Sequence, residues 1–146
     1  MSLSTINAYD VANVFTKLSD TDSGDILTNL KLQKLVYYVQ GFHLAIYNEP
    51  LYVDDLVAWE HGPVVVDLYH KLKDSKSGQI TIESPVSKLI NEKQLALIGE
   101  INNVYGQFSA WKLRDMTHNE SPWQTTEKNQ VITHEKLKAY FKKQLQ

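Results

Sequence analysis

The chain has 146 residues, of which 42% are hydrophobic and 22% are charged, and its formal net charge is −2. This size and composition are typical of one globular domain and leave little room for a long disordered segment. The absence of cysteine excludes disulfides, thiolate nucleophiles and cysteine-type zinc sites.

Neither a membrane span nor a secretory leader is visible in the sequence. No apolar run approaches the roughly 18 to 20 residues of a membrane helix, and residues 1–15 lack a basic start followed by an apolar core. We therefore expect a cytoplasmic protein that has no membrane partner.

The N-terminal region predicts a helix. Thr5 or Asn7 can cap its start, and residues 19–25 have the acidic, serine-rich composition of the turn that ends it. Its apolar face is expected to consist of Tyr9, Val11, Val14, Phe15 and Leu18.

The longest predicted helix follows a cap at Thr28 and stops before Pro50. Gly41 inside this helix costs up to about 1 kcal/mol relative to alanine, which indicates a close approach by another backbone or ring. Apolar residues recur at helical spacing at Leu32, Leu35, Val36, Val39, Phe42 or His43, and Ile46.

Two segments have the composition of short strands. They are residues 50–59, which mix β-branched and aromatic side chains, and residues 78–84, which lie between a glycine and a proline. Between them, Gly62 ends the extended segment, and Pro63 is expected to begin a helix because the N–H it lacks would be unpaired there. The core-facing residues of that helix are expected to be Val65, Leu68, Tyr69 and Leu72.

The C-terminal half predicts a series of short helices. One ends at Gly106, Ser109 caps the next, Ser121 caps another with Pro122 at its first position, and Thr133 opens a last helix over about 133–145. The predicted fold is mainly α: a single compact domain over residues 1–146, with about six helices and a small β-hairpin or two to three short strands.

Two histidine and glutamate pairs invite an acid–base interpretation. Glu60 precedes His61, and His118 lies two positions before Glu120; a histidine beside a carboxylate can exchange protons near neutral pH. Adjacent residues of a strand point to opposite faces, however. We therefore favour a structural role, in which Trp59 packs inward, its two neighbours orient the following turn, and the second pair bonds to a helix end.

Common cofactor and metal motifs are missing. None of the six glycines forms a phosphate-binding loop, and the five histidines lack the spacing of a zinc-binding helix. Arg114 is the only arginine, and base readout relies on arginine. We expect no metal, no cofactor, no enzyme activity and no specific nucleic-acid partner. The tail from residue 128 carries five lysines and is predicted to be a packed helix with those lysines in solvent.

The aromatic residues indicate protein binding, because tyrosine and tryptophan are enriched where proteins meet. The expected partner-binding residues are Tyr37, Tyr38, Tyr47 and Tyr69. Tyr37 and Tyr38 are adjacent on one helix, so at least one of them is expected at the edge of a groove. A tyrosine-rich core is the alternative interpretation.

Three blocks stand in the order of a known family signature. Residues 28–52 look like an opening helix, residues 58–73 contain the pattern A-W-x-x-G-P-V-x-x-x-x-Y, and residues 113–123 end in T-H-x-E-x-P-W. Together they resemble the Panacea antitoxin domain, the family that also contains SocA-like and GepA-like phage-associated proteins. The resemblance covers about 8–125. Its motif residues here are Trp59, Gly62, Pro63, Val64, Tyr69, Thr117, His118, Glu120, Pro122 and Trp123.

The resemblance has structural and functional implications. Residues 59–69 would form a strand, turn and helix, and residues 118–123 a clasp against them. The function implied is that of a stand-alone antitoxin in a bacterial or prophage toxin–antitoxin system, which neutralises a cognate toxin by direct contact. A SocA-like member also works as an adaptor that presents its toxin to a protease, so the resemblance implies this variant too.

Two functional hypotheses remain open at this point. An antitoxin should expose an aromatic anchor cluster with an acidic rim from Asp54, Asp55 and Glu60. A small hydrolase-like enzyme should instead gather both histidine and glutamate pairs around one pocket.

Overall fold

The computed structural model describes residues 5–19, 26–75 and 78–145. In these ranges it contains the α-helices α1 (Ala8–Leu18), α2 (Asn29–Tyr47), α3 (Val66–Leu72), α4 (Glu92–Tyr105), α5 (Ala110–His118), α6 (Ser121–Gln124) and α7 (His134–Gln144), a short 3-10 helix η2 (Lys73–Ser75), and the strands β1 (Leu56–Trp59), β2 (Gly62–Val64) and β3 (Val131–Ile132). The predicted mainly α class with a small sheet is confirmed. No helix within the described ranges is long and apolar enough to cross a membrane.

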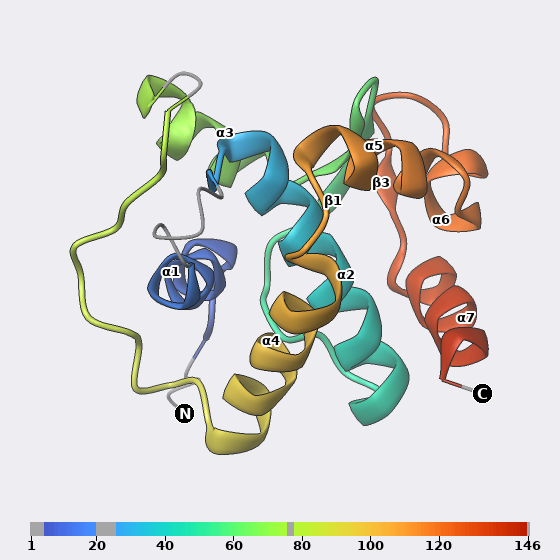
Figure 1. The fold of residues 1–146 in the computed structure, drawn as a ribbon. Helices are drawn as coiled ribbons and strands as arrows, with labels where there is room; N and C mark the ends of the chain where they lie inside the picture. The colour runs from blue at the N-terminus through green and yellow to red at the C-terminus, as the bar shows by residue number, and fades with distance from the viewer. Residues whose placement is uncertain (1–4, 20–25, 76–77, 146) are drawn as a thin grey trace.

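Helix α2 forms the centre of the molecule. Figure 1 shows α1 and α4 on one side of it and α7 on the other, and α3, α5 and β2 also contact it. Every residue from Lys31 to Gly41 is buried. The sequence predicted one apolar face for this helix; the neighbours on all sides instead leave it almost no solvent face.

Polar side chains on α2 are buried because the backbones of neighbouring segments satisfy them. Asn29 donates to the carbonyl of Tyr69 at 3.1 Å, and Gln33 accepts from the backbone N–H of Val65 at 2.9 Å. Gln40 accepts from the N–H of Leu51 at 2.7 Å. A buried polar group costs free energy unless it is hydrogen-bonded, so these pairs fix where α3 and the segment after α2 lie.

The sheet has the order β2-β1-β3, with antiparallel pairs. Trp59 pairs with Gly62, so Glu60 and His61 form the hairpin loop, and Gly62 has a φ of +108°, which glycine adopts readily. Pro63 therefore lies in a strand at the sheet edge, where its missing N–H is tolerated. The prediction that it begins a helix is wrong: α3 begins at Val66.

The second predicted strand, residues 78–84, is not a strand in the structure. Ile80 and Ile82 are buried and Thr81 is exposed, which is the alternation of a strand. Within the described ranges the segment has no strand paired with it, however, and the N–H of Ile80 bonds instead to the carbonyl of Leu27 at 2.8 Å. The side chains alternate between buried and exposed as in a strand, which explains why the sequence predicted a strand although the segment pairs with none in the described ranges.

Most predicted caps are confirmed. Asn7, Thr28, Ser109 and Thr133 each accept a backbone hydrogen bond at the start of a helix, and Gly106 ends α4. Helix α6 differs from the prediction by one position, because Glu120 and not Ser121 is its N-cap residue. Of the predicted turn at 19–25, residues 20–25 lie outside the described residues.

Gly41 lies at a close contact between α2 and α7. A Cβ atom at this position would lie 2.2 Å from the ring of Phe141, and Phe141 is fully buried. The predicted close approach at Gly41 is therefore confirmed, and the group that approaches is the Phe141 ring of α7.

Candidate partner-binding groove

A groove of about 530 Å³ opens beside the hairpin turn. A second hollow of about 500 Å³ shares Leu30, Tyr69 and Trp111 with it. The two together are called the aromatic groove below. Its apolar walls are Leu30, Trp59, Tyr69 and Trp111, and its charged lining residues are Lys34, Glu60, Lys73 and Lys128.

The aromatic walls come from three separate elements. Trp59 ends β1 and packs edge-on against Tyr69 of α3, with 5.3 Å between ring centroids. Trp59 is partly buried, whereas Tyr69 is 36% exposed and Trp111, in the first turn of α5, is 59% exposed. Large aromatic rings that remain accessible beside a groove are typical of protein-binding surfaces.

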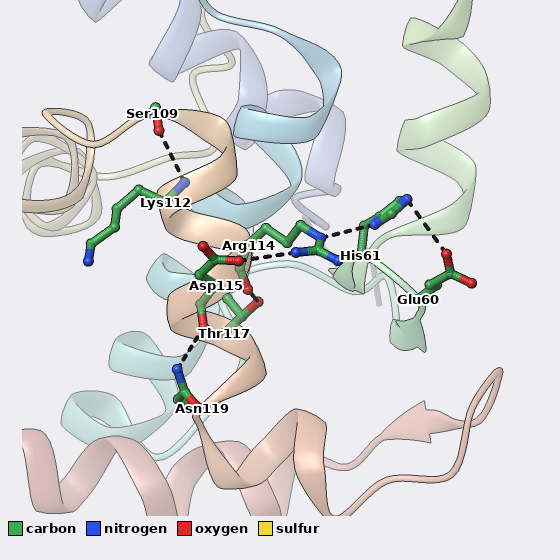
Figure 2. A network of polar contacts seen from close by, with 8 residues as sticks. All are labelled: Glu60, His61, Ser109, Lys112, Arg114, Asp115, Thr117 and Asn119. Atoms are coloured by element: carbon green, nitrogen blue, oxygen red, sulfur yellow. Dashed lines mark hydrogen bonds and ion pairs between the residues drawn. The ribbon is translucent and has the colours of Figure 1, made fainter.

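A polar chain connects the hairpin turn to α5, and Figure 2 shows its members in line. Arg114 Nε donates to His61 Nδ1 at 3.0 Å, and its Nη1 donates to Asp115 at 3.0 Å. Because Nδ1 of His61 is the acceptor, a neutral His61 carries its proton on Nε2, which lies 3.9 Å from the Glu60 carboxylate. The Arg114 guanidinium also lies 5.1 Å from the Trp111 ring centroid, so this arginine holds both the turn and the tryptophan.

Lys34 of α2 lies at the base of the groove and is 1% exposed. Its Nζ donates to the carbonyl of Pro63 at 3.0 Å. Burial, and then the charge of Arg114, lowers the pKa of Lys34 to about 7. A Cβ at Gly62 would lie 2.8 Å from Lys34 Cε and 2.7 Å from Thr117 Oγ1, so glycine is required there for space as well as for its backbone conformation.

Tyr37 and Tyr38 both point inward. Their hydroxyls donate to the two carboxylate oxygens of Glu120 at 2.8 and 2.7 Å, and both side chains are 0% exposed. The expectation that one of them lies at a groove edge is wrong, because α2 is buried at every residue from Lys31 to Gly41. Burial outweighs the two tyrosine hydrogen bonds and raises the pKa of Glu120 to about 7.

Two rings of the C-terminal motif block pack beside the hairpin: Trp123 bonds to it, and His118 stacks on Trp123. The Trp123 indole N–H donates to the carbonyl of Trp59 at 2.8 Å, and the His118 ring stacks on Trp123 with 4.1 Å between centroids. Burial, ahead of the charge of Arg114, lowers the pKa of His118. The two motif blocks are thus in contact, as the expected clasp requires.

The pocket required by the hydrolase-like hypothesis is not formed. Glu60 and His61 are exposed on the turn, whereas Glu120 is enclosed by two tyrosines and 7% exposed. His118 is stacked on Trp123 and does not line the groove. The prediction of one shared pocket for the four side chains is therefore wrong.

Two other expected surface features lie away from the groove. Tyr47 is 39% exposed at the end of α2, where its ring packs 4.7 Å from that of His43. Asp54 and Asp55 line a separate small hollow. Of the predicted acidic rim, only Glu60 borders the aromatic groove, and Lys128 Nζ lies 3.5 Å from its carboxylate.

Sequence reasoning did not select Trp111 or Lys34 as site residues. A signal for Trp111 was present: it lies two positions before the core residue Leu113, so on a helix it falls on the opposite face. Lys34 gave no such signal, since a lysine within an apolar helix pattern is usually solvated.

A comparison with protein families gives a match that covers the groove residues. The model of the family described as "Antitoxin SocA-like, Panacea domain" matches residues 32–124, more than half of the chain. That range includes Lys34, Trp59, Tyr69, Trp111 and Glu120. Searches of curated proteins and of solved structures return no significant match.

Proposed function

The chain belongs to the family of SocA-like antitoxins with a Panacea domain, and from this premise we propose that it neutralises a toxin by direct protein–protein contact. The proposed setting is a bacterial or prophage toxin–antitoxin pair in the cytoplasm. In this proposal the domain carries out no chemistry itself and acts by covering a surface that the toxin needs.

The aromatic groove is the observation that supports this proposal most strongly. Trp59, Tyr69 and Trp111 present aromatic surface around one depression, and tryptophan and tyrosine are the residues that most often dominate binding energy. The hairpin turn, α3 and α5 hold them in place, so little side-chain freedom would be lost on binding. The proposed contact therefore includes Tyr69 but neither Tyr37 nor Tyr38, and Tyr47 remains a prediction for a second contact.

Co-expression with the neighbouring reading frame tests the proposal. Growth rescue and co-purification should occur together. Trp111→Ala and Tyr69→Ala should each weaken the purified complex roughly 30-fold, the loss expected of a central aromatic contact. Leu89→Ala is the control, because Leu89 is 44% exposed and does not line the groove.

Each outcome of this experiment has a definite meaning. A neighbour that is harmless alone and does not co-purify rules out the antitoxin role for this copy. Rescue without a stable complex, accompanied by protease-dependent loss of the toxin, indicates the adaptor variant. Rescue that Trp111→Ala and Tyr69→Ala leave unchanged would place the contact elsewhere on the molecule.

A further inference from the structure

Lys34 is a buried lysine that has no counter-ion among the residues that the structure describes. An ammonium group has three N–H donors, and in the part of the chain that the structure describes the hydrogen bond to Pro63 is the only one shown for Lys34. No ion pair between described residues includes it. Buried charges are normally paired, so a lysine of this kind at the base of an open groove points to an anion supplied from outside.

The charge of the groove also favours an anionic ligand. Three lysines, Lys34, Lys73 and Lys128, line it against one glutamate, Glu60. Lys128 already lies beside that glutamate. The chain as a whole has a formal net charge of −2, so the groove is a positively charged site on an acidic protein, an arrangement that attracts acidic partners.

Gly62 packs directly against the lysine. A Cβ at this position would lie 2.8 Å from Lys34 Cε and 3.3 Å from Lys34 Nζ, and both residues line the groove. The close-packed hairpin turn therefore holds the ammonium group of Lys34 beside the groove.

We propose that the aromatic groove binds an acidic segment of the toxin, with an apolar side chain of that segment among Trp59, Tyr69 and Trp111 and its carboxylate paired with Lys34. This inference rests on the proposed function and adds the chemistry of the contact. The carboxylate supplies a counter-ion that no described residue of the chain provides. It would also favour the charged form of Lys34, whose pKa burial has lowered to about 7.

The test uses two small probes that differ only in charge. Indole-3-propionate and its amide are titrated into the full chain, and binding is followed by ¹⁵N and indole NMR signals. The carboxylate should shift the signals of Trp59, Tyr69 and Trp111 and bind about tenfold more tightly than the amide, the gain expected of a charge-assisted hydrogen bond. Equal affinities, or shifts that map outside the groove, would overturn the proposal.

Two variants test whether Lys34 is the side chain that causes the preference for the carboxylate probe over the amide. Lys34→Met should abolish the difference between the two probes, whereas Lys93→Met, which removes an exposed lysine on α4, should leave it intact. A preference that persists in Lys34→Met contradicts the assignment. If that variant does not fold, the ε-methylene signal of Lys34 in the unmodified protein gives the answer: it should shift with the carboxylate and not with the amide.

A second arm separates this inference from the antitoxin proposal. Overlapping peptides from the neighbouring protein should include one that competes with indole-3-propionate and weakens about tenfold when its acidic residue becomes an amide. Charge-dependent probe binding without any toxin would reject the antitoxin role and leave the carboxylate subsite standing. A neutralised toxin whose peptides and probes show no charge preference would reject the subsite alone.

Discussion

Glu120 has a buried carboxyl group that forms no ion pair with the part of the chain that the structure describes. Tyr37 and Tyr38 donate to its two oxygens, and no ion pair within residues 5–19, 26–75 and 78–145 includes it. Two neutral donors do not compensate for the lost hydration, which is why the pKa of Glu120 is raised from 4.5 to about 7. The ionised form is therefore the unfavourable one in the folded state.

This shift predicts how the free energy of unfolding depends on pH. Between pH 4.5 and about 7 the folded protein retains a proton on Glu120 that the unfolded chain has lost, so this residue makes stability fall as pH rises through that window. The contribution is on the order of 3 kcal/mol. Glu120→Gln should remove it, so that the variant gains stability relative to the parent protein between pH 5 and pH 8.

Urea unfolding of both proteins at several pH values measures the effect. All other titrating groups are shared, so the difference between the two curves isolates Glu120. A constant difference across this range would show that the carboxyl titrates normally in the folded state.

At the scale of single residues, the sequence was least informative about long-range partners. Tyr37 and Tyr38 lie 83 and 82 positions from Glu120, and no local pattern links them. Helical geometry therefore predicts that at least one of the two tyrosines lies at a groove edge, with a tyrosine-rich core as the alternative. The groove-edge prediction is wrong because it assumes that a helix has a solvent face, whereas both side chains are buried.

Helix boundaries could be predicted because their causes are local. Asn7, Thr28, Ser109 and Thr133 cap helices through bonds to residues three positions away. The strand at 78–84 failed for the opposite reason, since a strand exists only where another one pairs with it. The strand that does pair at the far edge of the sheet, β3, begins at Val131 and carries no local signal of its partner.

Alanine should have opposite effects on stability at two helical glycines, one packed against α7 and one in open space on α4. Gly41→Ala should destabilise the fold by about 1 to 3 kcal/mol, because the new methyl group meets the buried Phe141 ring at 2.2 Å. Gly99→Ala in α4 should stabilise it by about 0.5 to 1 kcal/mol, since no described atom outside the chain neighbours and the backbone of α4 lies within 4 Å of its Cβ position and alanine favours helix.

Thermal and urea unfolding of the two variants provides the comparison. Each variant serves as the control for the other, because both replace a glycine with an alanine inside a helix. A gain in stability for Gly41→Ala would mean that α7 moves away from α2 at little cost.

At the scale of the whole molecule, the fold brings residues that are distant in the sequence together around the aromatic groove. The aromatic groove draws its walls from α2, β1, α3 and α5, so it exists only once those elements are assembled. The family resemblance implied that the two motif blocks meet, and the structure supplies the hydrogen bond between Trp123 and Trp59 that joins them. Sequence patterns gave no indication that Trp111 would face the same depression as Tyr69.

The distribution of charge over the molecule predicts no sequence-specific DNA binding. Lys136 and Lys138 on α7 bond to Thr125 and Asn48 within the domain, which leaves few lysines of this helix for a phosphate backbone. In mobility-shift assays at physiological salt, the promoter DNA of its own gene should not be shifted at sub-micromolar protein in preference to scrambled DNA. A specific shift under these conditions would reveal an operator-binding surface that the fold does not suggest.

The contact between Gly41 and Phe141 also bears on biosynthesis. The two residues are 100 positions apart, so a ribosome that adds about 5 to 20 residues per second makes the central helix about 5 to 20 s before the ring that covers it. During that interval the apolar surface of α2 beneath α7 stays uncovered on the nascent chain. Helix α7 therefore closes the core only when it leaves the exit tunnel, and a complete folded domain becomes available only after translation has passed Phe141.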